Sequence, residues 1–376
     1  MKKIISLCCA FLIVFSTIPA KAQSELITTS KSVLLMEQST KQVLYENNAD
    51  EQLPIASVTK IMTMLLIMEA IDSGKITMED EVCVSERAMS MGGSTMFLET
   101  GEILSVYEML KGIAVASAND ACVAMAEFIS GSEETFVGLM NERAKELGMK
   151  NTNFVNTNGL DADNHYSSAR DVALMSAELL NHEKIFEFTT IWTDKMHNGQ
   201  FDLSNTNKLI RFYPGANGLK TGSTSKALCC LSATAKREEM QLIAVVLAAP
   251  TSQDRFSDAK KLLDYGFGNY QIKIPVNENE EVAKVPVILG EEKEIAVVSK
   301  STFSFLASKG DNVQPERKIV ITKEIKAPVK KGDVLGEIEI YRGEEKIGST
   351  ELISASDVSK KGFFLYFKEI FMMLFS

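Results

Sequence analysis

The chain has 376 residues, of which 45% are hydrophobic and 24% are charged, and its formal net charge is -10. This length allows two ordinary domains, and the composition is that of a globular rather than a disordered protein. The negative charge argues against nucleic acid as a partner, because neutralising phosphate groups requires a basic surface.

The N-terminal residues have the pattern of a secretory signal peptide. Lys2 and Lys3 precede an apolar run over residues 4–18, and the Ala-Lys-Ala sequence at 20–22 fits a signal-peptidase site. The apolar run is shorter than the roughly 20 residues that a membrane-spanning helix needs. We therefore expect residues 1–22 to be cleaved, so that the mature protein works at the outer face of the cytoplasmic membrane, in the cell-wall space.

Residues 23–270 predict an α/β (α+β) domain in which helices flank an antiparallel sheet. Two apolar runs within 31–46 predict an N-terminal hairpin, and two more within 226–250 predict a late hairpin that shares its sheet. Hydrophobic periodicity predicts the helices between them. These helices are expected over residues 58–72, 105–115, 118–130, 132–147 and 170–180. The first is almost entirely apolar, which indicates a buried helix.

The pattern changes near residue 271. Residues 271–356 alternate charged and apolar side chains in short segments, which predicts a small antiparallel all-β domain with one solvated face. Residues 357–376 then predict an amphipathic helix lying on the membrane surface as a peripheral anchor. Its apolar face would consist of Phe363, Phe367, Ile370, Phe371 and Leu374. A helix docked onto the protein's own core is the alternative.

The mature chain keeps four cysteines, Cys83, Cys122, Cys229 and Cys230. A domain of this size does not need disulfides, so we expect buried free thiols rather than bridges or metal ligands. The sequence has no HExxH motif, and its Asp161–Asp163 cluster lacks the glycine and glutamate of a calcium loop. We expect no metal and no other cofactor.

The first motif that carries chemistry lies at the start of the buried helix. Ser57 and Lys60 are three residues apart, so their side chains share one helix face, where the amine can take the hydroxyl proton. Desolvation against an apolar helix would lower the pKa of the lysine and make its neutral form available. The pairs Ser223–Lys226 and Ser257–Lys260 have the same spacing but lack such a helix. The sequence therefore predicts a serine nucleophile with a lysine base.

Two further motifs follow in order. Ser117 and Asn119 lie between two predicted helices, where they either line a cleft or simply cap the second helix. Lys220-Thr221-Gly222 enters the first strand of the late hairpin, where the lysine offers charge to a carboxylate and the glycine allows close approach to the backbone. A polar turn before a strand is the alternative for Lys220-Thr221-Gly222, the third motif. The order of the three motifs in an exported protein indicates a common site.

This motif set resembles that of the low-molecular-mass penicillin-binding proteins, the serine-type D-alanyl-D-alanine carboxypeptidases of bacterial cell-wall metabolism. The similarity extends to residues 156–175 and 218–237, the β domain and the tail. It implies a serine β-lactamase/penicillin-binding-protein-like fold. It also implies removal of the terminal D-alanine from peptidoglycan stem pentapeptides, with β-lactam antibiotics as covalent inhibitors.

The resemblance implies a role for each residue of the first two motifs. Ser57 would attack the penultimate D-alanine carbonyl and form an acyl-enzyme, and Lys60 would act as the base. Ser117 would relay protons near the leaving group, and Asn119 would hold a substrate amide.

The third motif would bind the C-terminal end of the substrate. Lys220 and Thr221 would bind the terminal carboxylate beside Gly222. The backbone N–H groups of Ser57 and Ser223 would form the oxyanion hole. Position 223 is serine where some relatives carry histidine, which leaves the backbone donor in place but puts the pH dependence in question.

Two other functions compete with this interpretation. A secreted serine β-lactamase would share the fold and the nucleophile, and Glu178 with Asn181 resembles the acid and asparagine of class A enzymes. Their spacing is one residue short, so we interpret them as a solvated helix face. The other alternative is a non-catalytic wall-binding protein, which the complete set of motif side chains disfavours.

Overall fold

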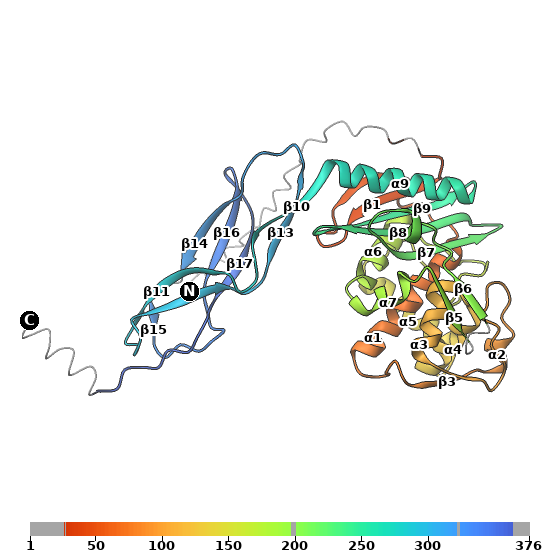
Figure 1. Cartoon of the computed structure of the whole chain (residues 1–376), viewed down its shortest axis with the longest axis horizontal. Coiled ribbons are helices and arrows are strands. Elements are labelled where there is room, and N and C mark those ends of the chain that lie inside the picture. The colour runs from red at the N-terminus through yellow and green to blue at the C-terminus, as the bar shows by residue number, and fades with distance from the viewer. Residues whose placement is uncertain (1–25, 27, 197–200, 322–323, 364–376) are drawn as a thin grey trace, which may run out of the picture.

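The computed structural model describes residues 26, 28–196, 201–321 and 324–363. The predicted signal peptide and most of the predicted C-terminal helix lie outside these residues. In the described part of the chain, no helix is both long and apolar enough to cross a membrane. The chain forms a larger body of helices around a sheet and a smaller body made of strands (Figure 1).

A five-stranded antiparallel sheet with the order β2-β1-β9-β8-β7 organises the larger body. Its strands are β1 Ser32–Glu37, β2 Val43–Asn47, β7 Ala216–Thr224, β8 Leu228–Arg237 and β9 Met240–Ala249. Because β1 pairs with β9, the prediction that the two hairpins share one sheet is confirmed. The prediction for Lys220-Thr221-Gly222 needs a correction: these residues form a separate strand, β7, at the edge of the sheet.

Both faces of this sheet are covered by apolar side chains. Alternate residues of β1 point to opposite sides, so Leu34 and Met36 join one core while Val33 and Leu35 join another. Helix α9 (Ser252–Asn269) packs on the second face, and the remaining long helices lie on the first (Figure 1). This double burial explains the nearly continuous apolar sequence of β9.

The helical layer holds Lys60 and Asn119, whereas the third motif lies on β7. Its helices are α1 Lys60–Asp72, α2 Glu86–Met89, α3 Val106–Lys111, α4 Asn119–Ser130, α5 Glu133–Glu146, α6 Ala169–Leu179, α7 Phe186–Thr189 and α8 Leu209–Phe212. The helix predicted over 105–115 is shorter than expected, because α3 gives way to a π-helical turn at Gly112–Ala116.

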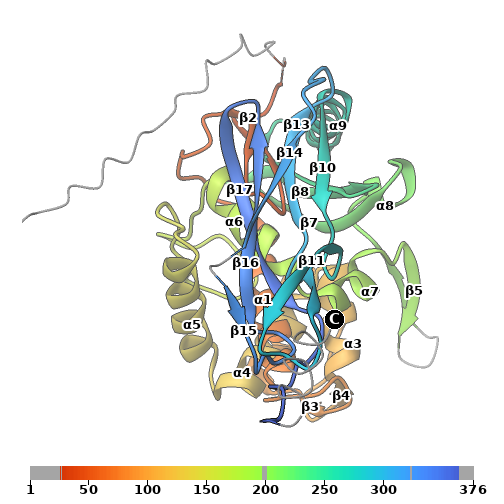
Figure 2. The same ribbon diagram turned by 90° about the vertical axis from the view of Figure 1, so that its left-hand side faces the viewer.

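Two short two-stranded antiparallel sheets accompany this layer. They consist of β3 Glu81–Cys83 with β4 Ile103–Ser105 and of β5 Thr193–Met196 with β6 Phe201–Ser204. Figure 2 shows β5 on the side of the larger body opposite α5.

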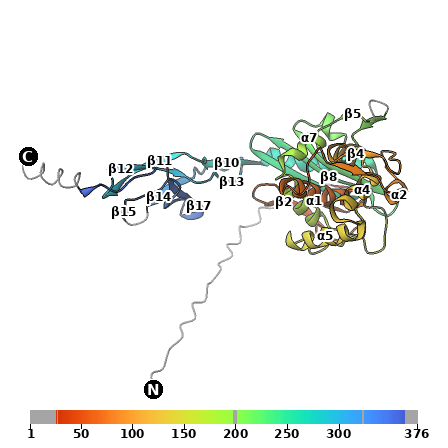
Figure 3. The same cartoon turned by 90° about the horizontal axis from the view of Figure 1, so that it is seen from below.

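The smaller body confirms the predicted all-β fold. Its strands are β10 Tyr270–Val276, β11 Glu281–Ile288, β12 Glu294–Ser299, β13 Phe303–Ser308, β14 Glu316–Ile321, β15 Ile325–Lys326, β16 Val334–Arg342 and β17 Glu345–Ser354. Six of them form a sheet that is antiparallel except at the short β15. The pair β10–β13 lies at the end of the smaller body that is next to the larger one (Figure 3). Alternating side chains such as Ile338 and Ile340 of β16 fill the core of the smaller body.

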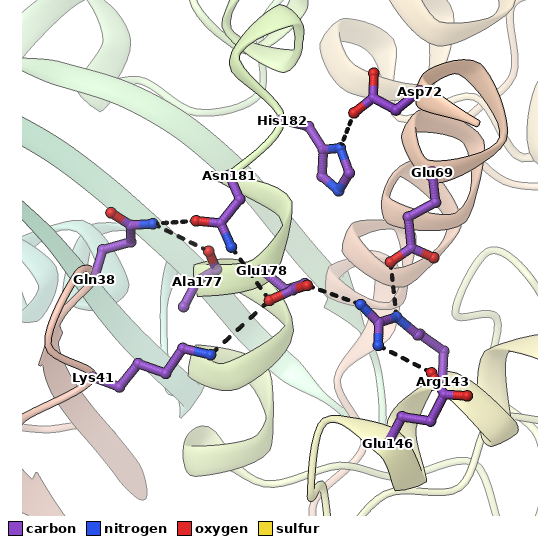
Figure 4. Close-up of polar contacts among 10 residues, drawn as sticks. All are labelled: Gln38, Lys41, Glu69, Asp72, Arg143, Glu146, Ala177, Glu178, Asn181 and His182. Carbon is purple, nitrogen blue, oxygen red and sulfur yellow. Dashed lines mark hydrogen bonds and ion pairs between the residues drawn. The ribbon is translucent and has the colours of Figure 1, made fainter. Parts of the chain in front are cut away.

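The interpretation of Glu178 and Asn181 as a solvated helix face holds for Asn181, which is exposed, but not for Glu178, which is half-buried and ion-paired. Figure 4 shows both residues in a polar network between α6, α5, α1 and the β1–β2 turn. Arg143 donates to Glu178 at 2.8 Å and to Glu69 at 2.7 Å, and Asn181 accepts from Gln38 at 2.8 Å. Half-buried Arg143 therefore ties α5 to the helix that follows the candidate nucleophile, and Glu178 holds a structural position.

The four cysteines of the described residues are free thiols, but they are not all buried. Cys122 and Cys230 are buried, and burial raises their pKa values to about 12 and about 11. Cys83 is exposed on β3 and Cys229 is half-buried. The expectation of burial therefore fails for Cys83, whose strand has only one covered face.

Candidate active site

Ser57 lies in a 3₁₀ turn, Ala56–Thr59, directly before α1. Two glycines allow other segments to pack against this turn. A Cβ on Gly222 of β7 would lie 2.9 Å from the Ser57 nitrogen, and one on Gly159 would lie 1.8 Å from the Ala56 carbonyl oxygen. Strand β7 and the loop around Gly159 therefore contact the serine from two sides, which places the backbone of the third motif beside Ser57.

Lys60 is fully buried, and its amine donates three hydrogen bonds. Its Nζ lies 2.9 Å from Ser57 Oγ, 2.6 Å from Asn119 Oδ1 and 2.6 Å from the carbonyl oxygen of Asn158. The predicted proximity of Ser57 and Lys60 is thus found in the structure. The other two bonds fix the amine so that it faces the hydroxyl.

Burial lowers the pKa of the Lys60 amine from 10.5 to about 8, although Cys122 and Asp120 oppose the shift. At pH 7 about a tenth of such an amine is neutral, compared with roughly 0.03% at the ordinary pKa. Its site therefore increases the neutral fraction by roughly 300-fold. The sequence predicted this direction from the apolar helix alone.

The second motif reaches the site through an irregular turn. The π-helical turn after α3 ends at Ser117, which is buried and has a left-handed backbone with φ +64°. Asn119 then begins α4, accepting from Lys60 and donating through Nδ2 to the Gly92 carbonyl at 2.7 Å. Because a carbonyl only accepts, the Gly92 contact fixes the Nδ2 side of the Asn119 amide and leaves Oδ1 facing Lys60. Asn119 therefore orients the Lys60 amine.

The third motif lies on β7, with Lys220 and Thr221 buried and Ser223 exposed. Lys220 Nζ donates to the Thr221 carbonyl at 3.1 Å, and Thr221 Oγ1 donates to Thr206 Oγ1 at 2.6 Å. The pKa of Lys220 lies well below its usual value, because the amine is buried and the charge of Lys60 is close to it. A bound carboxylate would supply the missing opposite charge and favour the protonated amine.

Sequence reasoning missed three residues that hold this site together. Asn158 supplies a carbonyl to Lys60, and Thr206 holds the hydroxyl of Thr221. Asp120 accepts from the backbone N–H groups of Met96 and Leu98 and so fixes the loop that contacts Asn119. An acid directly after Ser-x-Asn was the available signal for Asp120. The other two contacts join segments far apart in the sequence and gave no local signal.

His165 contacts the turn that carries the candidate nucleophile, Ala56–Thr59 (the nucleophile turn), from the loop that follows Gly159. Its Nδ1 accepts from the Val155 N–H at 3.0 Å, so Nε2 carries the proton and donates to Thr59 Oγ1 at 2.8 Å. Burial lowers the pKa of His165 to about 4, although Asp161 opposes the shift. The neutral ring is therefore the form that fits the folded chain.

We expect this histidine to make the protein less stable in mild acid. Its pKa falls from 6.5 to about 4 on folding, so only the unfolded chain takes up the proton between these values. With respect to this group, the free energy of unfolding is at its full value above about pH 6.5. It falls by on the order of 3 kcal/mol as the pH falls towards 4. Urea unfolding at pH 7 and pH 4.5 measures the loss. His165→Gln, which does not titrate, should lose less, and an equal loss in both proteins would contradict the assignment.

These contacts are typical of one class of protein, the serine acyl-transfer enzymes in which a lysine amine lies beside the serine hydroxyl. A family profile described as D-alanyl-D-alanine carboxypeptidase (peptidase S11) matches residues 19–251. A second profile, described as the C-terminal domain of penicillin-binding protein 5, matches residues 270–360. The chain belongs to the S11 family of D-alanyl-D-alanine carboxypeptidases, and the enzyme is a serine-type D-Ala-D-Ala carboxypeptidase.

Individual relatives agree with this assignment. The chain is 48% identical to the D-alanyl-D-alanine carboxypeptidase DacF of Bacillus subtilis (strain 168), over 94% of this chain and 92% of the relative. Its structure is similar to that of penicillin-binding protein 5 from Haemophilus influenzae, with a TM-score of 0.73 and 31% identity over 90% of this chain and 99% of the other.

A further solved structure contains an antibiotic. Penicillin-binding protein D2 from Listeria monocytogenes, in the ampicillin-bound form, has a TM-score of 0.59 and 32% identity over 65% of this chain and 99% of the other.

Proposed function

We propose that Ser57 and Lys60 carry the carboxypeptidase reaction of this chain on peptidoglycan stem peptides that end in D-Ala-D-Ala. The observation that carries the proposal is the 2.9 Å contact between Lys60 Nζ and Ser57 Oγ. Neutral Lys60 takes the proton of Ser57, whose oxygen attacks the carbonyl carbon of the penultimate D-alanine. The N–H groups of Ser57 and Ser223 stabilise the resulting oxyanion.

The tetrahedral intermediate then breaks its C–N bond. The amine of the terminal D-alanine receives a proton, through Ser117, and leaves, while the acyl group stays as an ester on Ser57. Water attacks this ester: its hydroxyl bonds to the acyl carbon and its proton goes to Lys60. The ester bond to Ser57 Oγ then breaks and Oγ takes the proton back from Lys60, which restores Ser57 and releases the shortened stem. Asn119 holds both Lys60 and a substrate amide during these steps.

Strand β7 orients the substrate by its C-terminus. Lys220 and the hydroxyl of Thr221 bind the terminal carboxylate, and Gly222 lets the substrate approach the strand backbone. The lowered pKa of Lys220 supports this role. A carboxylate that binds beside the amine supplies the opposite charge, so substrate binding favours the protonated amine. No cofactor takes part in the proposed steps.

We further propose that residues 1–22 direct export and that residues 357–376 anchor the protein to the outer face of the membrane. The catalytic domain then spans 23–270 and the β domain 271–356. The charge and apolar patterns of the two terminal segments support this arrangement.

Covalent capture by a β-lactam tests the nucleophile. The ampicillin-bound form of the Listeria relative supports β-lactam antibiotics as covalent inhibitors of this chain. Mixing the chain without residues 1–22 with benzylpenicillin should give one adduct by intact mass, which decays slowly, and Ser57→Ala should give none. D-alanine release from a D-Ala-D-Ala peptide should also require Ser57.

Other outcomes would redirect the proposal. Rapid hydrolysis of the drug without a lasting adduct would favour the β-lactamase alternative. An adduct that persists in folded Ser57→Ala would place the nucleophile elsewhere. A folded protein that forms no adduct and releases no D-alanine would remove the proposed role of Ser57.

A further inference from the structure

One aromatic residue, on the loop that contacts Asn119, has an unusual backbone and an exposed side chain. Phe97 has φ +60°, a left-handed conformation that a bulky L-residue rarely adopts, and its side chain is 71% exposed. Its neighbours Met96 and Leu98 are both buried. The chain therefore turns only the aromatic residue of this tripeptide towards the outside.

A buried carboxylate imposes this conformation. The Met96 N–H lies 3.1 Å from Asp120 Oδ2, and the Leu98 N–H lies 3.2 Å from the same oxygen. Two N–H groups on either side of Phe97 thus converge on one acceptor, which bends the backbone at Phe97. Strained backbone of this kind persists where surrounding contacts fix it, and such positions cluster at binding sites.

The loop that presents Phe97 also holds the second motif. The Asn119 N–H donates to the Ser94 carbonyl at 2.7 Å, and Asn119 Nδ2 donates to the Gly92 carbonyl at 2.7 Å. Phe97 follows Ser94 by three residues, so the two lie at most about 10 Å apart. Each residue of an extended peptide advances roughly 3.3–3.6 Å, so a bound stem can cover this distance with two or three residues.

We infer that Phe97 contacts the stem residues that precede D-Ala-D-Ala and selects long stem peptides over short ones. The inference rests on the proposed function, in which Asn119 holds a substrate amide. The aliphatic groups of those upstream residues would cover the exposed ring and remove its apolar surface from water. Phe97 is thereby assigned to substrate selection, and the acyl-transfer chemistry stays with Ser57 and Lys60.

The test compares two substrates in the same enzyme. The long one is the pentapeptide L-Ala-γ-D-Glu-L-Lys-D-Ala-D-Ala, and the short one is N-acetyl-D-Ala-D-Ala, which lacks the upstream residues. Phe97→Ala should lower kcat/KM for the pentapeptide by about tenfold and leave the short substrate within about twofold. Phe97→Gly, which relieves the backbone strain as well, should show the same change in ratio.

A matched control is Phe128→Ala, which removes a partly exposed aromatic from the far end of α4 and should leave both substrates unchanged. Equal losses on the two substrates would mean that Phe97 only supports the loop, and no loss on either would mean that it does not touch the stem. Both results overturn the inference. Wild-type protein that cleaves neither substrate would instead overturn the proposed function, and the inference with it.

Discussion

Lys60→Met is expected to lower the rate of Ser57 acylation by about 10³-fold, within the range that general-base catalysis contributes. Methionine keeps most of the length and apolar volume of the lysine but cannot accept the hydroxyl proton. The rate constant for acylation by benzylpenicillin, followed by mass, measures the loss directly. Near-normal acylation by the variant would exclude Lys60 as the base.

The same measurement in wild-type protein should depend on pH with a defined sign. The neutral amine is the reactive form, so the acylation rate should rise with pH and level off above a pKa of about 8. Below that value, each unit of pH should lower the rate about tenfold. The residual activity of Lys60→Met should lack this dependence.

Lys260→Met provides the control for loss of a lysine. Lys260 follows Ser257 by three residues, as Lys60 follows Ser57, but both residues lie on the surface helix α9, where Lys260 is only partly buried. Its removal should leave acylation within about twofold of wild type. Equal effects of the two substitutions would mean that the loss reflects general charge and not the contact with Ser57.

The parts of this site that the sequence predicted depend on local geometry. Serine and lysine three residues apart meet on one helix face in any helix, and an apolar helix predicts a buried amine. For the same reason, the alternation of charged and apolar side chains after residue 271 was sufficient to predict the all-β fold. Such features need only the period of a helix or a strand.

The parts that the sequence could not predict depend on tertiary contacts. Thr206 bonds Thr221 only because β7 forms the edge of the sheet, and the sequence around Lys220 lacks the apolar alternation that marks a strand. Glu178 was misassigned for a related reason, because its partner Arg143 lies on another helix. Glu178 was predicted to be solvated because the opposite charge that covers it is distant in the sequence.

Gly159→Ala is expected to lower acylation by about 10²-fold or more, although the added group is one methyl. Gly159 has φ +87°, and its Cβ would lie 1.8 Å from the Ala56 carbonyl oxygen and 2.9 Å from the Ser57 nitrogen. Neither of those atoms can move without moving the nucleophile turn, and a displacement of about 1 Å at a reacting group can cost 10²-fold in rate. Acylation by benzylpenicillin and thermal unfolding should be measured together.

Gly131→Ala separates the displacement of Ser57 from backbone strain. Gly131 has φ +83°, almost the value of Gly159, but its Cβ would meet nothing within 4 Å. Alanine there costs about 1–2 kcal/mol of stability for the left-handed backbone and leaves the nucleophile turn in place. Gly131→Ala should therefore unfold at lower temperature yet acylate at the wild-type rate, whereas Gly159→Ala should lose both stability and acylation. If folded Gly159→Ala keeps its rate, the close packing of this loop does not set the position of Ser57. The three hydrogen bonds of Lys60 must then be sufficient to hold its amine against the Ser57 hydroxyl.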